Sequence, residues 1–435
     1  MIEYNIPGVH VREHRVAVPL DWSRPDDGEI TLFVLELAES DRIDEELPVL
    51  VFLQGGPGGK SPRPLRKEGW IAEALRHYRV LLLDQRGTGR SSKVTAGVIG
   101  TFDSADDAAQ FLLLFRADSI VRDLEHLRRD YFRLDRWTTL GQSYGGFITL
   151  RYLSAAPEGL DRCLVAGGLA SLHPDAEEVY RRTYPRVAEK TRRYYERFPA
   201  DSDRIGAIAD ILASSDVRLP DGDRLTVRRF QTLGLGLGMS TGAQKLHWLV
   251  DEALSDDTLS DDGGSAPLGD PGPLGDAFLE SVMRETSYWE NPLFAVMQES
   301  IYGSGAGSTG WAAERERSKR PGFGIEDRPL MFTGEMMYPW MFEEIKSLRP
   351  FARAAEALAR VEDYSPLYDL DRLASNEVPV SAVVYFDDMY VDAGLSMETA
   401  AAVGNVTTWV TNEYQHDGLR DGTKVFERLV APVDG

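Results

Sequence analysis

The sequence predicts an α/β fold in which a mostly parallel, doubly wound sheet is interrupted by a mostly helical insertion. Three observations support this prediction. Short apolar runs such as residues 48–53 (PVLVFL) end at glycine-rich loops, which is typical of strands buried on both faces of a parallel sheet. Helical patterns alternate with these runs up to about residue 170. From about residue 171 to residue 360 helical patterns continue without matching strands, and strand-like segments return near residue 378.

The individual elements follow from hydrophobic periodicity and from turn-forming residues. A cluster of Pro, Asp and Gly at residues 21–28 separates the first two strands. The expected strands are residues 14–19, 29–37, 48–53, 80–83, 137–140, 163–169, 378–385 and 406–410. The expected helices are residues 119–131, 147–155, 177–198 and 351–360. Residues 255–275, dense in Asp, Gly, Pro and Ser, are expected to form a loop. The predicted domains are a first core part (1–170), a helical cap domain (171–360) and a second core part (361–435).

The composition excludes several classes of protein. The 435 residues include 48 Lys and Arg against 70 Asp and Glu, a formal net charge of −22. Such a charge repels nucleic acids and anionic membrane surfaces. No apolar run approaches the ~20 residues that span a bilayer, and residues 1–19 lack a signal-peptide pattern. The single cysteine, Cys163, excludes an internal disulfide and a cysteine-based zinc site. We expect a soluble cytoplasmic protein that needs no metal or other cofactor, and the sequence leaves its oligomeric state open.

Ser143 is a candidate nucleophile. Residues 141–146 (GQSYGG) match the G-x-S-x-G motif between a predicted strand and a predicted helix, which is the context in which this motif forms a nucleophile elbow. Glycines at positions 141 and 145 allow the sharp turn that lifts the serine hydroxyl clear of the sheet. The N-terminus of the following helix favours negative charge that develops at the site. The alternative is a chance Gly/Ser turn, which the strand–turn–helix context disfavours.

A glycine-rich loop follows the third predicted strand. Residues 54–61 (QGGPGGKS) resemble the end of a phosphate-binding P-loop, but Gln54 stands where its first glycine should be, and Pro57 would remove an N–H group that cradles phosphate. We therefore favour an oxyanion hole, with one N–H from this loop and the second from Tyr144, directly after the nucleophile. The sequence does not fix which glycine donates, and Gly56 is preferred.

A further glycine segment, residues 84–91 (DQRGTGRS), follows the next predicted strand. It lacks the G-x-G-x-x-G spacing of a dinucleotide site. We expect instead a tight structural loop beneath the nucleophile, in which Arg86 pairs with Asp84.

The general base is expected to be His416. In a serine hydrolase of this topology the acid and then the histidine follow the nucleophile in the chain. Of the seven histidines, only His173, His247 and His416 follow Ser143. His173 leaves no room for an intervening strand and acid, and His247 lies in the helical insertion. His416 follows the last predicted strand, where catalytic groups collect in sheets of this kind.

The acid is expected to follow the next-to-last predicted strand. Three carboxylates compete there, those of Asp387, Asp388 and Asp392. Asp388 is preferred, because it would fall a few residues past the strand end with its side chain turned toward His416. Its role would be to hold the imidazole tautomer and to stabilise the imidazolium that forms when Ser143 loses its proton.

Together these motifs resemble the α/β-hydrolase fold and, within it, the prolyl aminopeptidase (proline iminopeptidase) family. The matching core segments are residues 18–22 (VPLDW), 55–59 (GGPGG), 84–91 and 141–146. The segments that resemble the larger bacterial branch are residues 299–302 (ESIY), 334–340 (GEMMYPW), 387–392 (DDMYVD) and 416–418 (HDG). The sequence departs from the family at Gln54, where the family often has His, which leaves the backbone donors intact. It also departs at Tyr385, where many relatives of the fold have Gly, and this leaves the choice between Asp387 and Asp388 open.

The resemblance implies an α/β-hydrolase core with a helical cap and a serine aminopeptidase activity. Such an enzyme releases an N-terminal proline, with other small residues as further candidates, through an acyl-enzyme on Ser143. Its partners would be peptide substrates with a free N-terminus. Relatives bind the substrate ammonium with glutamates of the insertion, and the matching segments point to Glu299 and then to Glu335, with ordinary surface acids as the alternative. Three aromatic residues would line a pocket for the pyrrolidine ring or pack in the core: Tyr302, Tyr338 and Trp340.

Two other functions fit parts of the pattern. An esterase or amidase would use the same triad without requiring a free amine. A non-catalytic binding protein of this fold would have a broken triad or oxyanion loop, and neither is broken in this sequence. The distribution of acids adds one expectation, because residues 251–300 hold 12 acidic residues and one basic residue, which is half of the net charge. Most of these acids are expected to form a solvated loop, and a second prediction is that the segment steers cationic peptide N-termini.

Overall fold

The chain divides into two compact units. The computed structural model describes residues 2–254 and 274–431, so that most of the loop expected at 255–275 lies outside the described residues. The first unit comprises Met1–Ala176, Asn291–Gly310 and Arg353–Gly435, and the second comprises Glu177–Glu290 and Trp311–Ala352. Within the insertion expected at 171–360, residues 291–310 and 353–360 therefore belong to the first unit.

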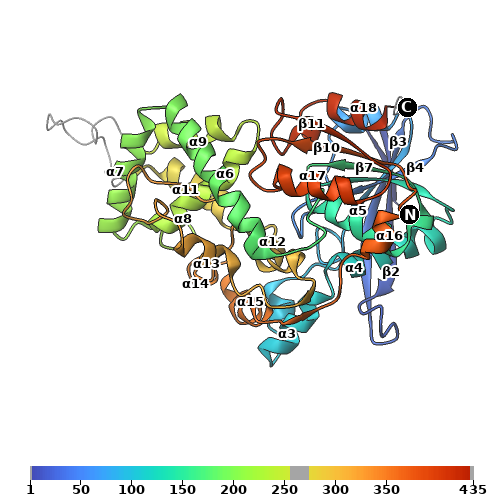
Figure 1. The fold of residues 1–435 in the computed structure, drawn as a ribbon, viewed down its shortest axis with the longest axis horizontal. Coiled ribbons are helices and arrows are strands. Elements are labelled where there is room, and N and C mark those ends of the chain that lie inside the picture. Colours follow the sequence, from blue (N-terminus) through green and yellow to red (C-terminus); the bar gives the residue numbers. More distant parts are fainter. Residues whose placement is uncertain (1, 255–273, 432–435) are drawn as a thin grey trace. The chain divides into compact units, whose positions relative to one another are not determined.

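One nine-stranded sheet forms the centre of the first unit (Figure 1). Its strands are β1 (Ile2–Ile6), β2 (Val9–Pro19), β3 (Glu29–Glu39), β4 (Val49–Leu53), β5 (Arg79–Asp84), β6 (Trp137–Gln142), β7 (Leu160–Ala166), β10 (Val380–Tyr385) and β11 (Val406–Thr411). Their order in the sheet is β1-β2-β3-β5-β4-β6-β7-β10-β11. The pairs β1–β2, β2–β3 and β3–β5 are antiparallel, and every neighbouring pair from β5 to β11 is parallel. The predicted mostly parallel α/β sheet is confirmed.

Helices pack on both faces of this sheet (Figure 1). The helices of the first unit are α1 (Gly69–Ala74), α2 (Ala96–Ile99), α3 (Ala105–Leu113), α4 (Ala117–His126), α5 (Tyr144–Ala155), α12 (Pro292–Met297), α15 (Ala352–Ala359, its first residue in the second unit), α16 (Leu370–Ala374), α17 (Ala393–Ala402) and α18 (Lys424–Val430). Trp70 of α1 and Phe426 of α18 share a buried cluster with Phe52 of β4. Helix α5 approaches Leu53, whose side chain points to the opposite face because strand side chains alternate.

The second unit is helical where the structure describes it. Its helices are α6 (Ala176–Arg197, its first residue in the first unit), α7 (Asp201–Ser214), α8 (Val227–Gln231), α9 (Gly242–Asp251), α11 (Asp276–Thr286), α13 (Ala312–Ser318) and α14 (Met341–Glu344). The fully buried Asp201 links three of these helices, since its Oδ2 accepts from Tyr194 Oη at 2.5 Å and lies 2.8 Å from His247 Nδ1. His247 thus contributes to the packing of this unit.

The predicted elements are found within a few residues of their expected positions. The helix expected at 119–131 is α4 followed by a π-helical turn at Leu127–Tyr131, and the strand expected at 163–169 begins three residues earlier, at Leu160. The exposed strand β1 and the two-stranded sheet of β8 (Gly305–Ala306) and β9 (Asp363–Tyr364) were not predicted. In the described part of the chain, no helix combines the length and the apolar character needed to cross a membrane.

The predicted pair between Arg86 and Asp84 is wrong. Arg86 is fully buried and donates from Nε and Nη2 to the carboxylate of Asp123 at 2.7 and 2.6 Å. Asp84 instead pairs with Arg63 and accepts from the backbone N–H of Arg90 at 2.8 Å. Asp84 and Asp123 thus both anchor the loop at 84–91. The partner of Arg86 is Asp123, which lies on helix α4 and is distant from Arg86 in the sequence.

Candidate active site

A sharp turn places Ser143 between strand β6 and helix α5. Its backbone has φ 55° and ψ −125°, a conformation that costs a non-glycine residue on the order of 1–3 kcal/mol and is retained mainly at functional sites. The turn needs a glycine at position 145, because an added Cβ there would lie 1.9 Å from the carbonyl oxygen of Leu53. Ser143 is buried but not fully inaccessible, with 8% of its surface exposed. This geometry is that of a nucleophile elbow.

Asp388 and His416 form a buried pair. Nδ1 of His416 lies 2.6 Å from Oδ2 of Asp388, and the two residues are 4% and 2% exposed, respectively. The other carboxylate oxygen of Asp388 accepts from the backbone N–H groups of Tyr390 at 2.8 Å and Val391 at 3.2 Å. The turn after β10 therefore fixes the carboxylate, and the carboxylate in turn orients the imidazole.

The two competing carboxylates occupy other positions in the same turn. Asp392 caps helix α17, because its Oδ1 accepts from the backbone N–H of Leu395 at 3.1 Å. Asp387 is partly exposed, at the start of the turn. The geometry favours Asp388 as the partner of His416.

Ser143 and His416 both lie next to residues at the end of strand β7. The backbone N–H of Ser143 donates to the carbonyl of Ala166 at 3.0 Å. An added Cβ at Gly168 would lie 2.4 Å from the carbonyl oxygen of Ser143, and one at Gly167, whose φ is +55°, would lie 3.4 Å from Nδ1 of His416. Gly167 and Gly168 were not among the predicted site residues, although a Gly-Gly pair inside the segment predicted as a strand at 163–169 is a signal for a close backbone approach.

Aromatic side chains enclose the imidazole. The ring of Tyr390 meets His416 edge to face, with centroids 4.8 Å apart. Tyr385 packs closely enough against Gly167 that an added Cβ there would lie 2.9 Å from its ring. Burial, and then the nearby negative charge of Asp388, raise the pKa of Tyr385. The ring of Tyr385 thus occupies the space that is left by the missing side chains of Gly167 and Gly418.

The glycine loop lies against the nucleophile. An added Cβ at Gly55 would lie 2.8 Å from Cβ of Ser143, so the peptide unit that follows Gly55, which carries the N–H of Gly56, is next to the serine side chain. Tyr144 is the first residue of α5, and a helix leaves its first N–H groups without an intrahelical acceptor. These two N–H groups can together stabilise a negatively charged oxygen at Ser143.

Glu299 belongs to the first unit, together with Ser143 and His416. It is buried and directly precedes the short turn Ser300–Tyr302. The buried guanidinium of Arg116 holds this turn by donating to the carbonyl of Ser300 at 3.2 Å and to that of Gly303. The ring of Tyr302 lies 5.9 Å from that of Phe147, one turn into the helix that Ser143 precedes. The turn after Glu299 thus packs against helix α5.

Glu335, Tyr338 and Trp340 belong to the second unit. Tyr338 is buried and stacks on Trp340, with centroids 5.8 Å apart, and its Oη lies 2.9 Å from Oη of Tyr184. Glu335 is partly buried, and its charge contributes, after burial, to raising the pKa of Tyr288. These three residues thus take part in the packing of that unit.

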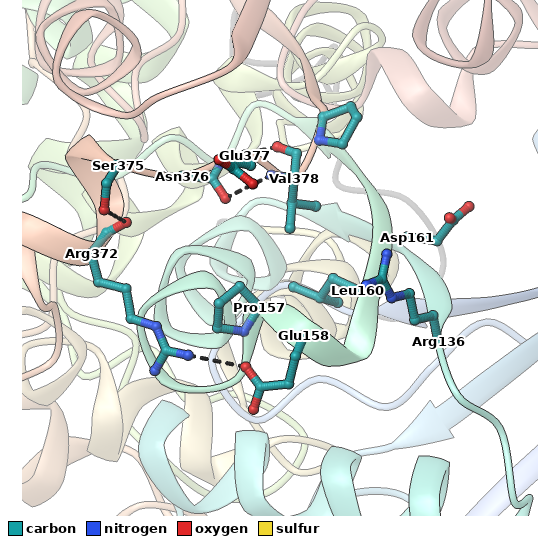
Figure 2. A pocket seen from close by; sticks show the side chains of 11 residues that line it. Arg136, Pro157, Glu158, Leu160, Asp161, Arg372, Ser375, Asn376, Glu377 and Val378 are labelled. Carbon is teal, nitrogen blue, oxygen red and sulfur yellow. Dashed lines mark hydrogen bonds and ion pairs between the residues drawn. The ribbon is translucent and has the colours of Figure 1, made fainter.

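A separate cavity lies at the other edge of the sheet. It has a volume of about 470 Å³ and is lined by residues around the amino-terminal ends of β6, β7 and β10, among them Arg136, Leu160 and Val378 (Figure 2). Arg372 pairs with Glu158 beside it at 3.0 Å. Because Ser143 and the Asp388 turn follow the carboxyl ends of β6 and β10, this cavity is not part of the candidate active site.

Comparison with known proteins gives four matches. A family model described as "alpha/beta hydrolase fold" matches residues 48–254. A proline iminopeptidase of Aeromonas sobria is 44% identical over 432 residues, which cover 99% of this chain and 98% of that protein. The proline iminopeptidase aneH of Aspergillus aculeatus is 33% identical, over 96% of this chain and 92% of that protein. Among solved structures, an acetylester hydrolase from Corynebacterium glutamicum aligns over 97% of this chain and 96% of that chain, with a TM-score of 0.43 and 12% identity.

Proposed function

Because the chain belongs to the proline iminopeptidase family of α/β hydrolases, we propose that it releases an N-terminal proline from peptides through an acyl-enzyme on Ser143. The observation that carries the assignment of residues is the strained turn of Ser143 beside the buried Asp388–His416 pair. This arrangement contains a nucleophile, a base and a group that orients the base, as covalent acyl transfer requires.

The reaction follows from these positions. Ser143 Oγ attacks the carbonyl carbon of the N-terminal proline while His416 accepts the hydroxyl proton, and Asp388 stabilises the resulting imidazolium. The N–H groups of Gly56 and Tyr144 donate to the oxyanion. The bond to the second residue breaks as His416 returns the proton to the leaving amine. Water, deprotonated by His416, then attacks the prolyl ester and releases proline.

Glu299 is the proposed site for the substrate ammonium. Its burial supports this role, because a charge pair is stronger where water is excluded. The contact between Tyr302 and Phe147 also supports it, since it holds the following turn against the nucleophile helix. Tyr302 itself is buried and would contact the pyrrolidine ring. Glu335 is the second candidate for the ammonium.

A matched pair of substrates tests the function. The enzyme should cleave a prolyl arylamide with a free amine and should not cleave the same compound with an acylated amine. Covalent labelling by a fluorophosphonate, lost in Ser143→Ala, should identify the nucleophile. Equal cleavage of both arylamides would instead indicate an esterase or amidase that does not require a free amine, and a wild-type protein that resists labelling would indicate a non-catalytic protein.

The cellular setting of the activity is also a proposal. We propose that the partners are peptides with free N-termini and that the protein acts in the cytoplasm, without nucleic acid or a membrane surface as partner. The net charge of −22 supports the exclusion of nucleic acids and of anionic membrane surfaces, because both carry negative charge that the protein would repel. Fractionation of the source cells, followed by the prolyl arylamide assay on each fraction, tests the location.

A further inference from the structure

We propose that Arg420 is a positioning residue that ties together the three catalytic elements of the first unit. These elements are the histidine loop (residues 416–420), the nucleophile turn (residues 142–144) and the glycine loop (residues 54–59). The proposal deepens the proposed function and rests on it for the roles of these elements.

The guanidinium of Arg420 reaches the residue that begins each of the other two elements. Its Nη2 donates to Oε1 of Gln142 at 3.1 Å. When the amide of Gln54 is oriented with its oxygen toward the neighbouring donors, this oxygen accepts from Arg420 Nη2 at 3.2 Å and from the backbone N–H of Gly55 at 3.1 Å. Gln54 and Gln142 are both buried. Buried amides require partners, and a charged donor makes the stronger hydrogen bond.

The backbone connects the same arginine to the histidine. Arg420 ends the short 3-10 turn Gly418–Arg420, four residues after His416. Its backbone N–H donates to the carbonyl of Asp417 at 2.7 Å. A shift of the guanidinium would therefore be transmitted to the loop that carries the imidazole.

The bond to Gln54 has a direct consequence for the oxyanion hole. The side-chain oxygen of Gln54 accepts the hydrogen bond of the Gly55 N–H, so this N–H already has a partner within the protein. Gly55 lies against Ser143, and the N–H of the next residue, Gly56, is therefore the one that can donate to the substrate oxyanion. Loss of Arg420 would release Gln54 and let this peptide unit move. Displacement of a reacting group by about 1 Å can lower the rate about 10²-fold.

A cavity makes this hypothesis testable by chemical rescue. It has a volume of about 720 Å³, and its lining includes Gln54, Gln142, Arg420 and the carboxylate-bearing Glu68. Arg420 itself is exposed. Truncation of its side chain would leave a space beside the two amides that a free guanidinium ion can enter from solvent.

The experiment compares Arg420→Ala with wild type on a prolyl arylamide. We expect kcat to fall about 10²-fold and KM to change little, because the hydrogen bonds from the guanidinium hold groups that act in the transition state. Millimolar guanidinium should raise kcat of this variant about tenfold and leave wild type unchanged. Arg420→Lys should lie between the two proteins, since one ammonium cannot match the planar fork that serves both amides.

Arg372→Ala is the matched control. Arg372 also joins separate segments, donating to the carbonyl of Ala155 at 3.0 Å and to Glu158 at 3.0 Å, and it borders the cavity at the other edge of the sheet (Figure 2). We expect this variant to keep wild-type kcat and to show no response to guanidinium.

The outcomes separate positioning from stability and from the proposed function. A kcat of Arg420→Ala within about twofold of wild type would overturn the proposal. So would a loss of activity that guanidinium does not restore and that Arg372→Ala shares. If wild type does not cleave the prolyl arylamide but reacts with a fluorophosphonate, the proposed function is wrong. The role of Arg420 is then tested by the rate at which Ser143 is labelled in wild type and in Arg420→Ala, each with and without guanidinium.

Discussion

Replacement of Asp388 by asparagine should abolish most of the activity while preserving the fold. One oxygen of Asp388 accepts hydrogen bonds from the backbone N–H groups of Tyr390 and Val391, and the side-chain oxygen of asparagine can accept the same two bonds. The asparagine NH₂ then faces Nδ1 of His416 in place of the oxygen now at 2.6 Å. Because a donor cannot pair with N–H, the imidazole would carry its proton on Nε2 and could not accept the proton of Ser143.

The expected magnitude follows from this wrong tautomer. Exchange of a triad aspartate for asparagine lowers kcat about 10⁴-fold, which corresponds to about 5.5 kcal/mol of transition-state stabilisation. KM should change little, since Asp388 contacts no substrate. The assay is initial-rate release of arylamine from a prolyl arylamide, with thermal unfolding as the check on folding.

Asp387→Asn is the matched control, because it makes the same chemical change one residue away. We expect its kcat to stay within about tenfold of wild type. The reasoning is refuted if Asp388→Asn retains near-normal kcat, or if the two variants lose activity equally.

Further predictions concern substrate binding, the nucleophile turn and long-range charge. Glu299→Gln should lower kcat/KM on the prolyl arylamide by on the order of 10²-fold and leave fluorophosphonate labelling unchanged; a loss of both would indicate a structural role. Gly145→Ala should destabilise the fold by about 3 kcal/mol, because the added Cβ would lie 1.9 Å from the Leu53 carbonyl oxygen. Gly236→Ala, whose added Cβ meets no heavy atom within 4 Å, should leave the melting temperature nearly unchanged, and equal shifts would contradict the steric argument. If the acidic residues of 251–300 steer peptides, kcat/KM should fall as salt rises while labelling does not, and a salt-independent kcat/KM would exclude steering.

Local patterns predicted most strands of the central sheet from sequence. Strands β4 and β5 contain short apolar runs that stop at glycine-rich loops, so both the strand and the following turn are encoded within about ten residues. The chain order of Ser143, Asp388 and His416 reflects a topology that recurs among serine hydrolases. For this reason the candidate triad could be selected before its geometry was known.

Interactions between distant segments could not be predicted in this way. The carboxylate that neutralises Arg86 lies on α4, 37 positions along the chain, whereas the sequence pattern favoured the acid two positions away. The bond from Arg420 to Gln142 spans 278 positions. Strand β1 has only five residues, nearly all exposed, and therefore lacks the apolar run by which strands were recognised.

The division of the first unit into three chain segments also bears on biosynthesis. Strands β10 and β11 complete the parallel part of the sheet, and they come from the last of these segments. A ribosome therefore releases His416 and two of the nine strands only after it has synthesised the whole second unit. Until then β7, a buried central strand, presents an unpaired apolar edge. Truncated products would lack the base altogether and would expose this edge to other chains, so premature termination should yield aggregation-prone protein without proteolytic activity.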